Sequence, residues 1–359
     1  MSRHLFVLVA ALALAAPAPG SAQSTAADKA ERARIAQERD RERAAERAEQ
    51  ERDRAEERRE RDRDRAEELR ERERDREEQR RERDAAGSLD TTIVFDAKGA
   101  LSISCAGGDV IVTGTNRNEI KVRARTERGA LRFTSNGSTA RLEPASTRSC
   151  GDGHFEISVP AGIHLSAETW SGSLTVHGVH GEVEAHAQSG DIEVRDAGDR
   201  LEVETLSGDA TIQGVRGDAS VHTLSGDVSI EGARGTVEVE TVSGDIELRD
   251  VDSKQVRTSS TSGDLAFAGA IVSGGRYEFT THSGELRLQL PANVGAQLSL
   301  STFSGEIDSD FPITLKAGEH GIGSSQAKKL NFALGQGTAR IIAETFSGDV
   351  TLSSTKRRP

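Results

Sequence analysis

The tripeptide Ser-Gly-Asp recurs through the C-terminal part of the chain, and successive copies from Gly190 to Gly244 lie 18 residues apart. The aspartates of this series are Asp191, Asp209, Asp227, Asp245 and Asp264. If equivalent residues stack, these carboxylates form a column of like charges, which costs energy unless each is screened, hydrogen-bonded or bound to a cation. Calcium suits such ligands. Because the glycine-rich nonapeptide of calcium-binding β-rolls is absent, a calcium-stabilised β-roll is kept only as an alternative.

Local turn chemistry explains the same tripeptide without any ligand. Glycine can adopt positive φ at a corner and lets neighbouring backbones approach closely. Serine and aspartate on either side of it can bond a free backbone NH at the turn. We therefore interpret Ser-Gly-Asp as scaffolding.

Histidines offer a second kind of chemistry. His177, His180 and His186 are close enough in sequence to suggest zinc ligands, but the repeat places all of them outward and no fourth ligand follows from the spacing. A further pattern comes from the eighth position of alternate repeat units, where histidine and glutamate alternate. This column is predicted to contain His186, Glu204, His222 and Glu240. It is either a pH-sensitive ladder or an ordinary solvated face.

Catalysis has little support in the sequence. A polysaccharide enzyme would need a cleft that gathers carboxylates with aromatic or arginine subsites, and the chain has a single Trp and a single Tyr. No nucleophile elbow, phosphate-binding loop or HExxH motif is present. We predict a protein that is not an enzyme, with no catalytic, cofactor-binding or metal-binding residues. The alternative, a polysaccharide hydrolase or lyase on a β-helix, requires one cleft that contains Trp170, Tyr277, Arg195 and Arg249 with carboxylates.

The elements that would position these residues follow from a nine-residue unit, in which apolar residues alternate with polar ones. Leu206, Gly208, Ala210 and Ile212 fill one such unit. Period-two alternation predicts strands with one buried face, and the pattern places Leu206 with the other apolar residues in the core. Two units form one 18-residue repeat. We predict an all-β fold, a parallel β-solenoid with about 18 residues per coil, over an antiparallel meander, because the apolar residues are small and two-residue hairpin signals are absent.

The N-terminus predicts export. Arg3 and His4 precede a short apolar run at 5–16, and small residues suited to signal peptidase follow near Ala22. No later segment approaches the length of a transmembrane helix. We divide the chain into a signal peptide at 1–22, a charged spacer at 23–87, the β-solenoid at 88–355 and a basic tail at 356–359. The mature protein is expected in the periplasm, at the cell surface or outside a bacterial cell.

The spacer consists almost wholly of Arg, Glu, Asp and Ala, with opposite charges three and four residues apart. Such pairs support a single helix. Ile35 and Leu69 are its only large aliphatic residues, so a coiled coil would have few apolar residues with which to pack a partner helix. The segment is predicted to be either a charged helix or a disordered linker.

The cysteine content predicts a disulfide, and the net charge excludes one class of partner. Cys105 and Cys150 are the only cysteines, and in an oxidising compartment we expect them to form a disulfide, with two buried thiols as the alternative. The formal net charge of −12 argues against nucleic acid as a partner, because phosphate binding needs a basic surface.

Three longer segments share a strand, a loop, a second strand and then Thr-(Trp/Phe)-Ser-Gly. They are ISVPAGIHLSAETWSGSLTV (157–176), LQLPANVGAQLSLSTFSGEI (288–307) and NFALGQGTARIIAETFSGDVTL (331–352). With the Thr-x-Ser-Gly-Asp repeats, they resemble a bacterial β-strand-repeat family usually labelled "putative adhesin", a domain of unknown function, over about residues 90–352. The resemblance implies a right-handed parallel β-helix of the cell envelope or surface without a known catalytic site. The expected role is an adhesin-like binding or structural module, with an envelope protein or polysaccharide as partner.

Overall fold

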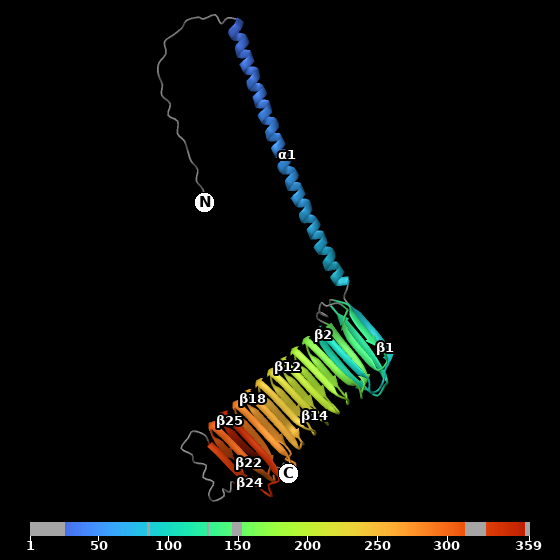
Figure 1. Ribbon diagram of the computed structural model, residues 1–359, viewed down its shortest axis with the longest axis vertical. Helices are drawn as coiled ribbons and strands as arrows, with labels where there is room; N and C mark the ends of the chain where they lie inside the picture. The colour runs from blue at the N-terminus through green and yellow to red at the C-terminus, as the bar shows by residue number, and fades with distance from the viewer. Residues whose placement is uncertain (1–25, 85–86, 128, 146–152, 313–327, 356–359) are drawn as a thin grey trace, which may run out of the picture. The chain divides into compact units, whose positions relative to one another are not determined.

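The computed structural model describes residues 26–84, 87–127, 129–145, 153–312 and 328–355 (Figure 1). Within these residues a single helix precedes a long series of β-strands. The predicted signal peptide at 1–22 and the basic tail at 356–359 lie outside the described residues.

Helix α1 (Ala26–Asp84) accounts for most of the predicted spacer. Ion pairs one turn apart, such as Glu57 with Arg61 and Glu68 with Arg72, both at 2.9 Å, lie along its surface. Each such pair contributes about 0.2 to 0.5 kcal/mol to the helix. Ile35 is exposed, as expected for a helix without an apolar stripe. Of the two forms predicted for this segment the structure has the helix, and no helix among the described residues is long and apolar enough to cross a membrane.

The strands form two sheets of 13 strands each in the described part of the chain. In spatial order, sheet A contains β1 (Ser88–Val94), β4 (Glu119–Thr126), β7 (Gly153–Pro160), β3 (Asp109–Thr115), β9 (Leu174–His177), β11 (Ile192–Arg195), β13 (Ala210–Gln213), β15 (Val228–Glu231), β17 (Ile246–Val251), β19 (Leu265–Gly269), β21 (Leu286–Pro291), β26 (Val350–Thr355) and β23 (Ile307–Ser309). Sheet B contains β24 (Lys328–Leu334), β22 (Ala296–Ser304), β25 (Ala339–Ser347), β20 (Arg276–Ser283), β18 (Gln255–Ser262), β16 (Val237–Ser243), β14 (Asp218–Ser225), β12 (Arg200–Ser207), β10 (Val183–Ser189), β8 (His164–Ser171), β2 (Ala100–Gly107), β6 (Thr139–Pro144) and β5 (Leu131–Ser135).

Each central coil uses one strand from each sheet. The chain follows β12 in sheet B, turns at Ser-Gly-Asp, follows the shorter β13 in sheet A and returns through a second corner to β14. Leu201 lies beside Val183 on one side and Ala219 on the other, in parallel pairs 18 residues apart. The predicted solenoid with one 18-residue repeat per coil is therefore confirmed (Figure 1).

The core is a narrow space between the two sheets. Leu201 and Val203 of β12 and Ala210 and Ile212 of β13 are all buried, as the alternation predicts. Aromatic residues enter the core near β19 and β20 and pack as tilted rings, and the residues involved are Phe267, Tyr277 and Phe279. In the coils from β9 to β16 the buried hydrophobic side chains are small and aliphatic, and they keep the two sheets close together.

The glycine of Ser-Gly-Asp has the role that the sequence predicts. Gly208 and Gly226 have φ of +149° and +150°. A Cβ on Gly226 would lie 2.0 Å from the Gly208 carbonyl oxygen of the preceding coil. Both positive φ and close contact between successive backbones thus require glycine at this corner.

The threonine of Thr-x-Ser-Gly has a related role that the sequence analysis missed. Its side chain points into the core, and several copies donate their hydroxyl to a corner glycine carbonyl of the adjacent coil. These bonds are Thr281 to Gly263 at 3.3 Å, Thr345 to Gly284 at 3.2 Å and Thr302 to Gly348 at 2.9 Å. In these three copies threonine thus provides a partner for a carbonyl group at the corner, whereas Oγ1 of Thr169, Thr205, Thr223 and Thr241 is buried without a hydrogen-bond partner.

At both ends the coils do not stack in sequence order. β25 lies between β20 and β22, and β26 lies between β21 and β23, so the last repeat is inserted into the stack. At the other end β2 and β3 stack directly on β8 and β9, but further strands lie beyond them. Antiparallel pairs, which the sequence did not predict, occur near these ends in β1–β4, β4–β7, β5–β6 and β22–β24.

Candidate functional site

A column of histidines and glutamates runs across the outer face of sheet B, one residue per coil. We call it the polar column, and its members are Glu168, His186, Glu204, His222 and Glu240. Strand pairing places each member directly beside the next, so the column predicted from the eighth repeat position is confirmed and is extended by Glu168. Ser104 and Ser259 follow at its two ends.

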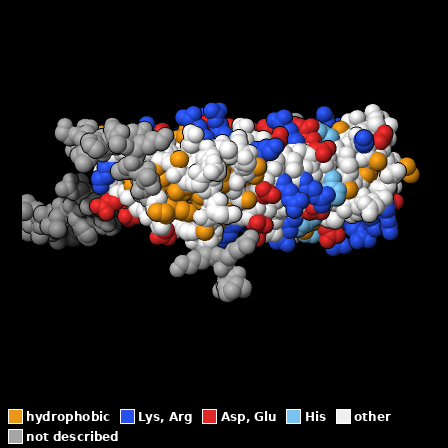
Figure 2. Space-filling model, turned by 90° about the horizontal axis from the view of Figure 1, so that it is seen from below, with side chains coloured by type: hydrophobic (Ala, Val, Ile, Leu, Met, Phe, Trp, Pro, Cys, Tyr) orange, Lys and Arg blue, Asp and Glu red, His pale blue; other side chains and the backbone are white. Residues whose placement is uncertain are grey.

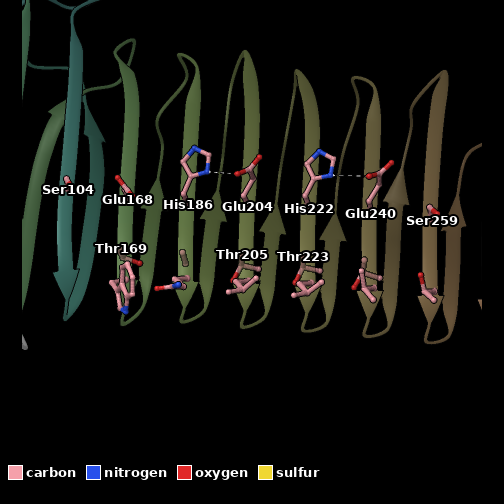
Figure 3. A pocket seen from close by; sticks show the side chains of 18 of the residues that line it. Ser104, Glu168, Thr169, His186, Glu204, Thr205, His222, Thr223, Glu240 and Ser259 are labelled. Carbon is pink, nitrogen blue, oxygen red and sulfur yellow. Dashed lines mark hydrogen bonds and ion pairs between the residues drawn. The ribbon is translucent and has the colours of Figure 1, made fainter.

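Neighbouring members of the polar column are paired (Figure 3). His186 Nδ1 lies 3.0 Å from Glu204 Oε2, and His222 Nδ1 lies 3.5 Å from Glu240 Oε2. Ser220 Oγ lies 3.0 Å from Nε2 of His222. These side chains are between one third and about one half exposed. An exposed pair contributes at most about 1 kcal/mol to stability. The main consequence of the column is therefore that it presents a row of carboxylates and imidazoles at the surface.

A second column lies two residues further along each strand. We call it the apolar column, and its members are Trp170, Gln188, Leu206, Leu224, Val242 and Thr261. Trp170 is 63% exposed and Leu206 is 47% exposed. The prediction that Leu206 belongs to the core is wrong, because strand β12 directs Leu201, Val203 and Thr205 inward and therefore turns Leu206 outward.

The two columns are the walls of an open groove of about 950 Å³. Its floor is formed at the inward-facing positions between the columns, where Thr169, Thr205 and Thr223 lie (Figure 3). None of the residues that line it is a lysine or an arginine. The groove is therefore acidic and imidazole-bearing on one wall and apolar on the other.

Aromatic rings continue the apolar column toward the C-terminal coils. Phe346 stacks on His282 with ring centroids 4.9 Å apart and on Phe303 with centroids 4.8 Å apart. Both phenylalanines are partly exposed. Exposed apolar residues are thus concentrated on one face of an otherwise polar solenoid, which is typical of an interaction surface.

The zinc interpretation of His177, His180 and His186 gains no support from the geometry. His180 is bonded to Asp196 at 3.2 Å, and His186 is bonded to Glu204 in the polar column. No group of three His, Cys, Asp or Glu side chains among the described residues is arranged to hold a metal ion. Asp196 instead forms a small cluster with His180 and with Arg216, whose Nη2 lies 2.9 Å from its carboxylate.

This cluster predicts that the free energy of unfolding depends on pH in the acidic range. The hydrogen bond from His180, with the charge of Arg216, lowers the pKa of Asp196. A carboxyl group with a lowered pKa stabilises the folded state above its unfolded value near 4, and this contribution is lost as the pH falls through the folded pKa. We expect Asp196→Asn to lower the free energy of unfolding at pH 7 by no more than about 0.5 kcal/mol, because the cluster is half exposed.

Urea unfolding of both chains from pH 7 to pH 2 measures this effect. The difference should shrink below about pH 4. Asparagine also tolerates the φ of +54° at this position, so backbone strain should not contribute, and a difference that persists unchanged at pH 2 would contradict the assignment to the carboxylate charge.

The aspartates after the corner glycines form a ladder of hydrogen bonds between coils. Oδ1 of Asp191 accepts a bond from the backbone NH of Asp209 at 2.9 Å, and Oδ1 of Asp227 accepts one from Asp245 at 2.8 Å. The same bond links Asp245 to Asp264. The predicted bond to a backbone NH is thus present, but its donor belongs to the next coil. Each carboxylate therefore accepts a hydrogen bond from a backbone NH without the need for a cation.

We expect Asp227→Ala to lower the free energy of unfolding by about 1 kcal/mol, because the Asp245 NH loses its acceptor. Asp227→Asn keeps an acceptor oxygen and removes one charge of the ladder, so it should cost less. Chemical denaturation with and without calcium measures both effects. A large calcium-induced rise in the free energy of unfolding that disappears in Asp227→Ala would instead support the calcium-stabilised β-roll.

The residues that an enzyme would gather are dispersed. Trp170 lies in the groove, whereas Tyr277 is fully buried in the core. Arg195 and Arg249 lie on strands of sheet A and pair with Glu193 and Glu247 of their own strands. The requirement for a polysaccharide hydrolase or lyase, a single cleft with all four residues, is not met.

The disulfide stays a prediction. Cys105 is on β2, where its backbone pairs with Thr169, but Cys150 and the Cys105 side chain lie outside the described residues.

The fold and the groove define a class of protein: a two-sheet β-solenoid with corner glycines and an open groove on one sheet. The family model "Toastrack DUF4097" matches residues 100–353, and the chain belongs to this family, a domain of unknown function. The family resemblance seen in the repeats is therefore confirmed.

A search of curated proteins found no match. Two solved structures are similar at low identity. One, described as a "putative cell adhesion protein" from Clostridium sporogenes ATCC 15579, is 10% identical over 75% of this chain and 100% of that chain, with a TM-score of 0.21. The other, a "putative adhesin" from Bacteroides fragilis NCTC 9343, is 12% identical over 74% of this chain and 96% of that chain, with a TM-score of 0.31.

Proposed function

We propose that this chain is an exported, non-catalytic binding module of the bacterial envelope or cell surface, adhesin-like in role, and that it binds through the groove on sheet B. The single observation that carries this proposal is the apolar column. Trp170, Leu206, Leu224 and Val242 are between 45% and 63% exposed on neighbouring coils. Large apolar side chains aligned on one face cost solubility, and they are typical of a surface that a partner covers.

The form of the groove indicates the form of its partner. Adjacent strands of a sheet lie about 4.8 Å apart, so the column from Trp170 to Thr261 is about 24 Å long. A partner must be extended or have a long flat face to contact it all. An envelope polysaccharide or an envelope protein meets this requirement.

The charges elsewhere support recognition by the columns over recognition by net charge. Figure 2 shows one face of the molecule, on which acidic and basic side chains are interspersed. On this face charges of both signs are mixed at short range, although the chain as a whole has a formal net charge of −12. Specificity would then depend on local contacts at the groove.

Binding of the purified full chain to envelope fractions and to an array of envelope polysaccharides tests the proposal. The double variant Leu206→Asp with Leu224→Asp introduces charge into the apolar wall and should weaken binding by about tenfold or more. The matched control is Thr211→Asp with Ser229→Asp, which adds the same charge to sheet A of the same coils and should change binding less than about twofold. Equal losses in the two variants would contradict the assignment of the groove.

A further inference from the structure

We propose that the partner at the groove is a second copy of this chain, docked face to face on sheet B with its long axis reversed. The inference rests on the proposed function and names the partner of the same surface. Two-fold pairing of identical surfaces is the commonest form of protein self-association. It requires a surface whose pattern is complementary to itself.

The alternation of the polar column provides that self-complementarity. Consider a two-fold axis that lies between the two faces, parallel to the strands and midway between β12 and β14. It places each strand of one copy opposite the strand of the second copy that is equally far from the axis on the other side. β12 then faces β14 of the second copy, and β10 faces β16. Glu204 consequently lies opposite His222, and His186 lies opposite Glu240.

The order of the side chains in the polar column places the axis between two coils and not on one, and the contact between Leu206 and Leu224 selects the position between β12 and β14. An axis through β12 itself would place Glu204 opposite Glu204 and His186 opposite His222, so every contact in the polar column would join like groups. When the axis is moved by half a coil, to the midpoint between β12 and β14, Glu204 faces His222 and His186 faces Glu240. Each of these contacts occurs twice because of the symmetry, so four histidine–carboxylate contacts form around the axis. Pairing of opposite charge across an interface fixes its register more than its strength.

The neighbouring columns mostly agree with the same axis. Arg200 on β12 lies beside Asp218 on β14 within one chain, so across the axis Arg200 faces Asp218 of the second copy. In the apolar column Leu206 faces Leu224 of the second copy. The exposed leucines would thereby be covered by each other.

One contact is unfavourable. Glu184 on β10 and Glu238 on β16 occupy equivalent outward positions on their coils and would face each other across the axis. Their repulsion predicts that removal of either charge strengthens the pairing. A dimer held only by apolar contacts would show no such specific effect.

The face is large enough for a specific complex. Eight strands from β2 to β20, about 4.8 Å apart and about 25 Å long, cover on the order of 800 Å² per copy. This is about the area that each partner buries in a standard specific interface.

Protonation of the histidines is expected to control the pairing. A histidine side chain gains its charge between about pH 8 and pH 5, whereas glutamate keeps its charge in this range. Acidic groups predominate around the two histidines, so two neutral-histidine faces repel each other. Acidification adds positive charge opposite carboxylates and should strengthen the dimer. The charged and titratable groups around them on the face, strand by strand, are His164 and Glu168 on β8, Glu182 and Glu184 at β10, Arg200, Glu202 and Glu204 on β12, Asp218 on β14, Glu238 and Glu240 on β16, Arg257 on β18, and Arg276, Glu278 and His282 on β20.

Sedimentation equilibrium of the full chain at pH 5.5 and pH 7.5 tests this proposal. The dissociation constant of the dimer should be at least about tenfold lower at pH 5.5. Glu238→Gln should lower it further at both pH values, and Leu224→Glu should abolish the dimer. Ser229→Glu on sheet A is the matched control for added charge and should have no effect. Circular dichroism verifies that each variant is folded.

A charge exchange tests the register. Glu204→Lys alone should weaken the dimer at pH 5.5, because the introduced ammonium group would face the protonated His222 of the second copy. The combination of Glu204→Lys with His222→Glu restores opposite charges across the axis and should recover the dimer. A monomer at both pH values up to about 100 µM, or a dimer that is indifferent to Leu224→Glu, would overturn the proposal.

The result also separates this inference from the proposed function. If the chain is monomeric but the Leu206→Asp, Leu224→Asp variant loses binding to envelope material, the second-copy partner is wrong and the groove binds something else. If neither measurement responds to substitutions in the groove, both proposals are wrong.

Discussion

Gly226→Ala is expected to lower the free energy of unfolding of the solenoid by about 3 kcal/mol or more, one of the largest effects of any single substitution in the chain. Gly226 has φ of +150°, where a side chain is strained. The added Cβ would also lie 2.0 Å from the Gly208 carbonyl oxygen, and backbone cannot move aside as a flexible side chain does. The corner must shift, and the strands on both sides of it lose their register.

Gly274→Ala is the matched control. Gly274 also has positive φ, at +73°, but a Cβ there would meet no atom within 4 Å. Its replacement should cost only about 1 kcal/mol from backbone strain. Urea unfolding followed by circular dichroism measures both values. If the two variants lose equal stability, the contact between successive corners does not carry the stability assigned to it.

The repeat made the centre of the fold predictable from sequence. Gly208 and Gly226 are 18 residues apart and lie against each other, and Leu201 and Ile212 alternate with polar neighbours as buried strand residues must. When every coil has the same length, equivalent residues stack, so a period in the sequence becomes a position in space. For the same reason the polar column, with His186 beside Glu204, could be predicted from the spacing alone.

The apolar wall of the candidate site was not predictable from hydrophobicity alone. Leu206 has the same residue type as the buried Leu201, and only strand phase separates them. The inward position next to the corner is occupied by Thr205, a polar residue that a search for apolar positions assigns to the surface. The useful signal was the phase itself, because counting in twos from Leu201 and Val203 reaches Thr205 and leaves Leu206 outside.

The order of coils at the ends was not predictable for a different reason. The repeat that contains β25 and β26 has the same Thr-x-Ser-Gly-Asp corner as the others, and it therefore fits beside any of them. The chain forms β24 on the outer side of β22 before β25 enters between β20 and β22, and nothing in the repeat itself distinguishes that position from another. Local sequence specifies a coil but does not specify its neighbours.

Tyr277→Phe is expected to lower the free energy of unfolding by about 2 kcal/mol, although it removes only one oxygen atom. The Tyr277 hydroxyl is fully buried, donates to the Ser253 carbonyl oxygen at 2.7 Å and accepts from the backbone NH of Val272 at 2.8 Å. Phenylalanine fills the same space between Phe267 and its neighbours but leaves both backbone groups without this bond. Chemical denaturation at pH 7 gives the difference.

Alkaline titration distinguishes this role from simple packing. Burial raises the pKa of Tyr277 above its ordinary value of 10.0. Because the folded pKa is the higher one, the hydroxyl contributes fully below about pH 10, and the contribution is lost as the pH rises toward the folded value. Tyr277 is the only tyrosine, so its ionisation can be followed by absorbance without interference. The native chain should lose stability above pH 10 more steeply than Tyr277→Phe, and parallel curves would show that the hydroxyl is not held as described.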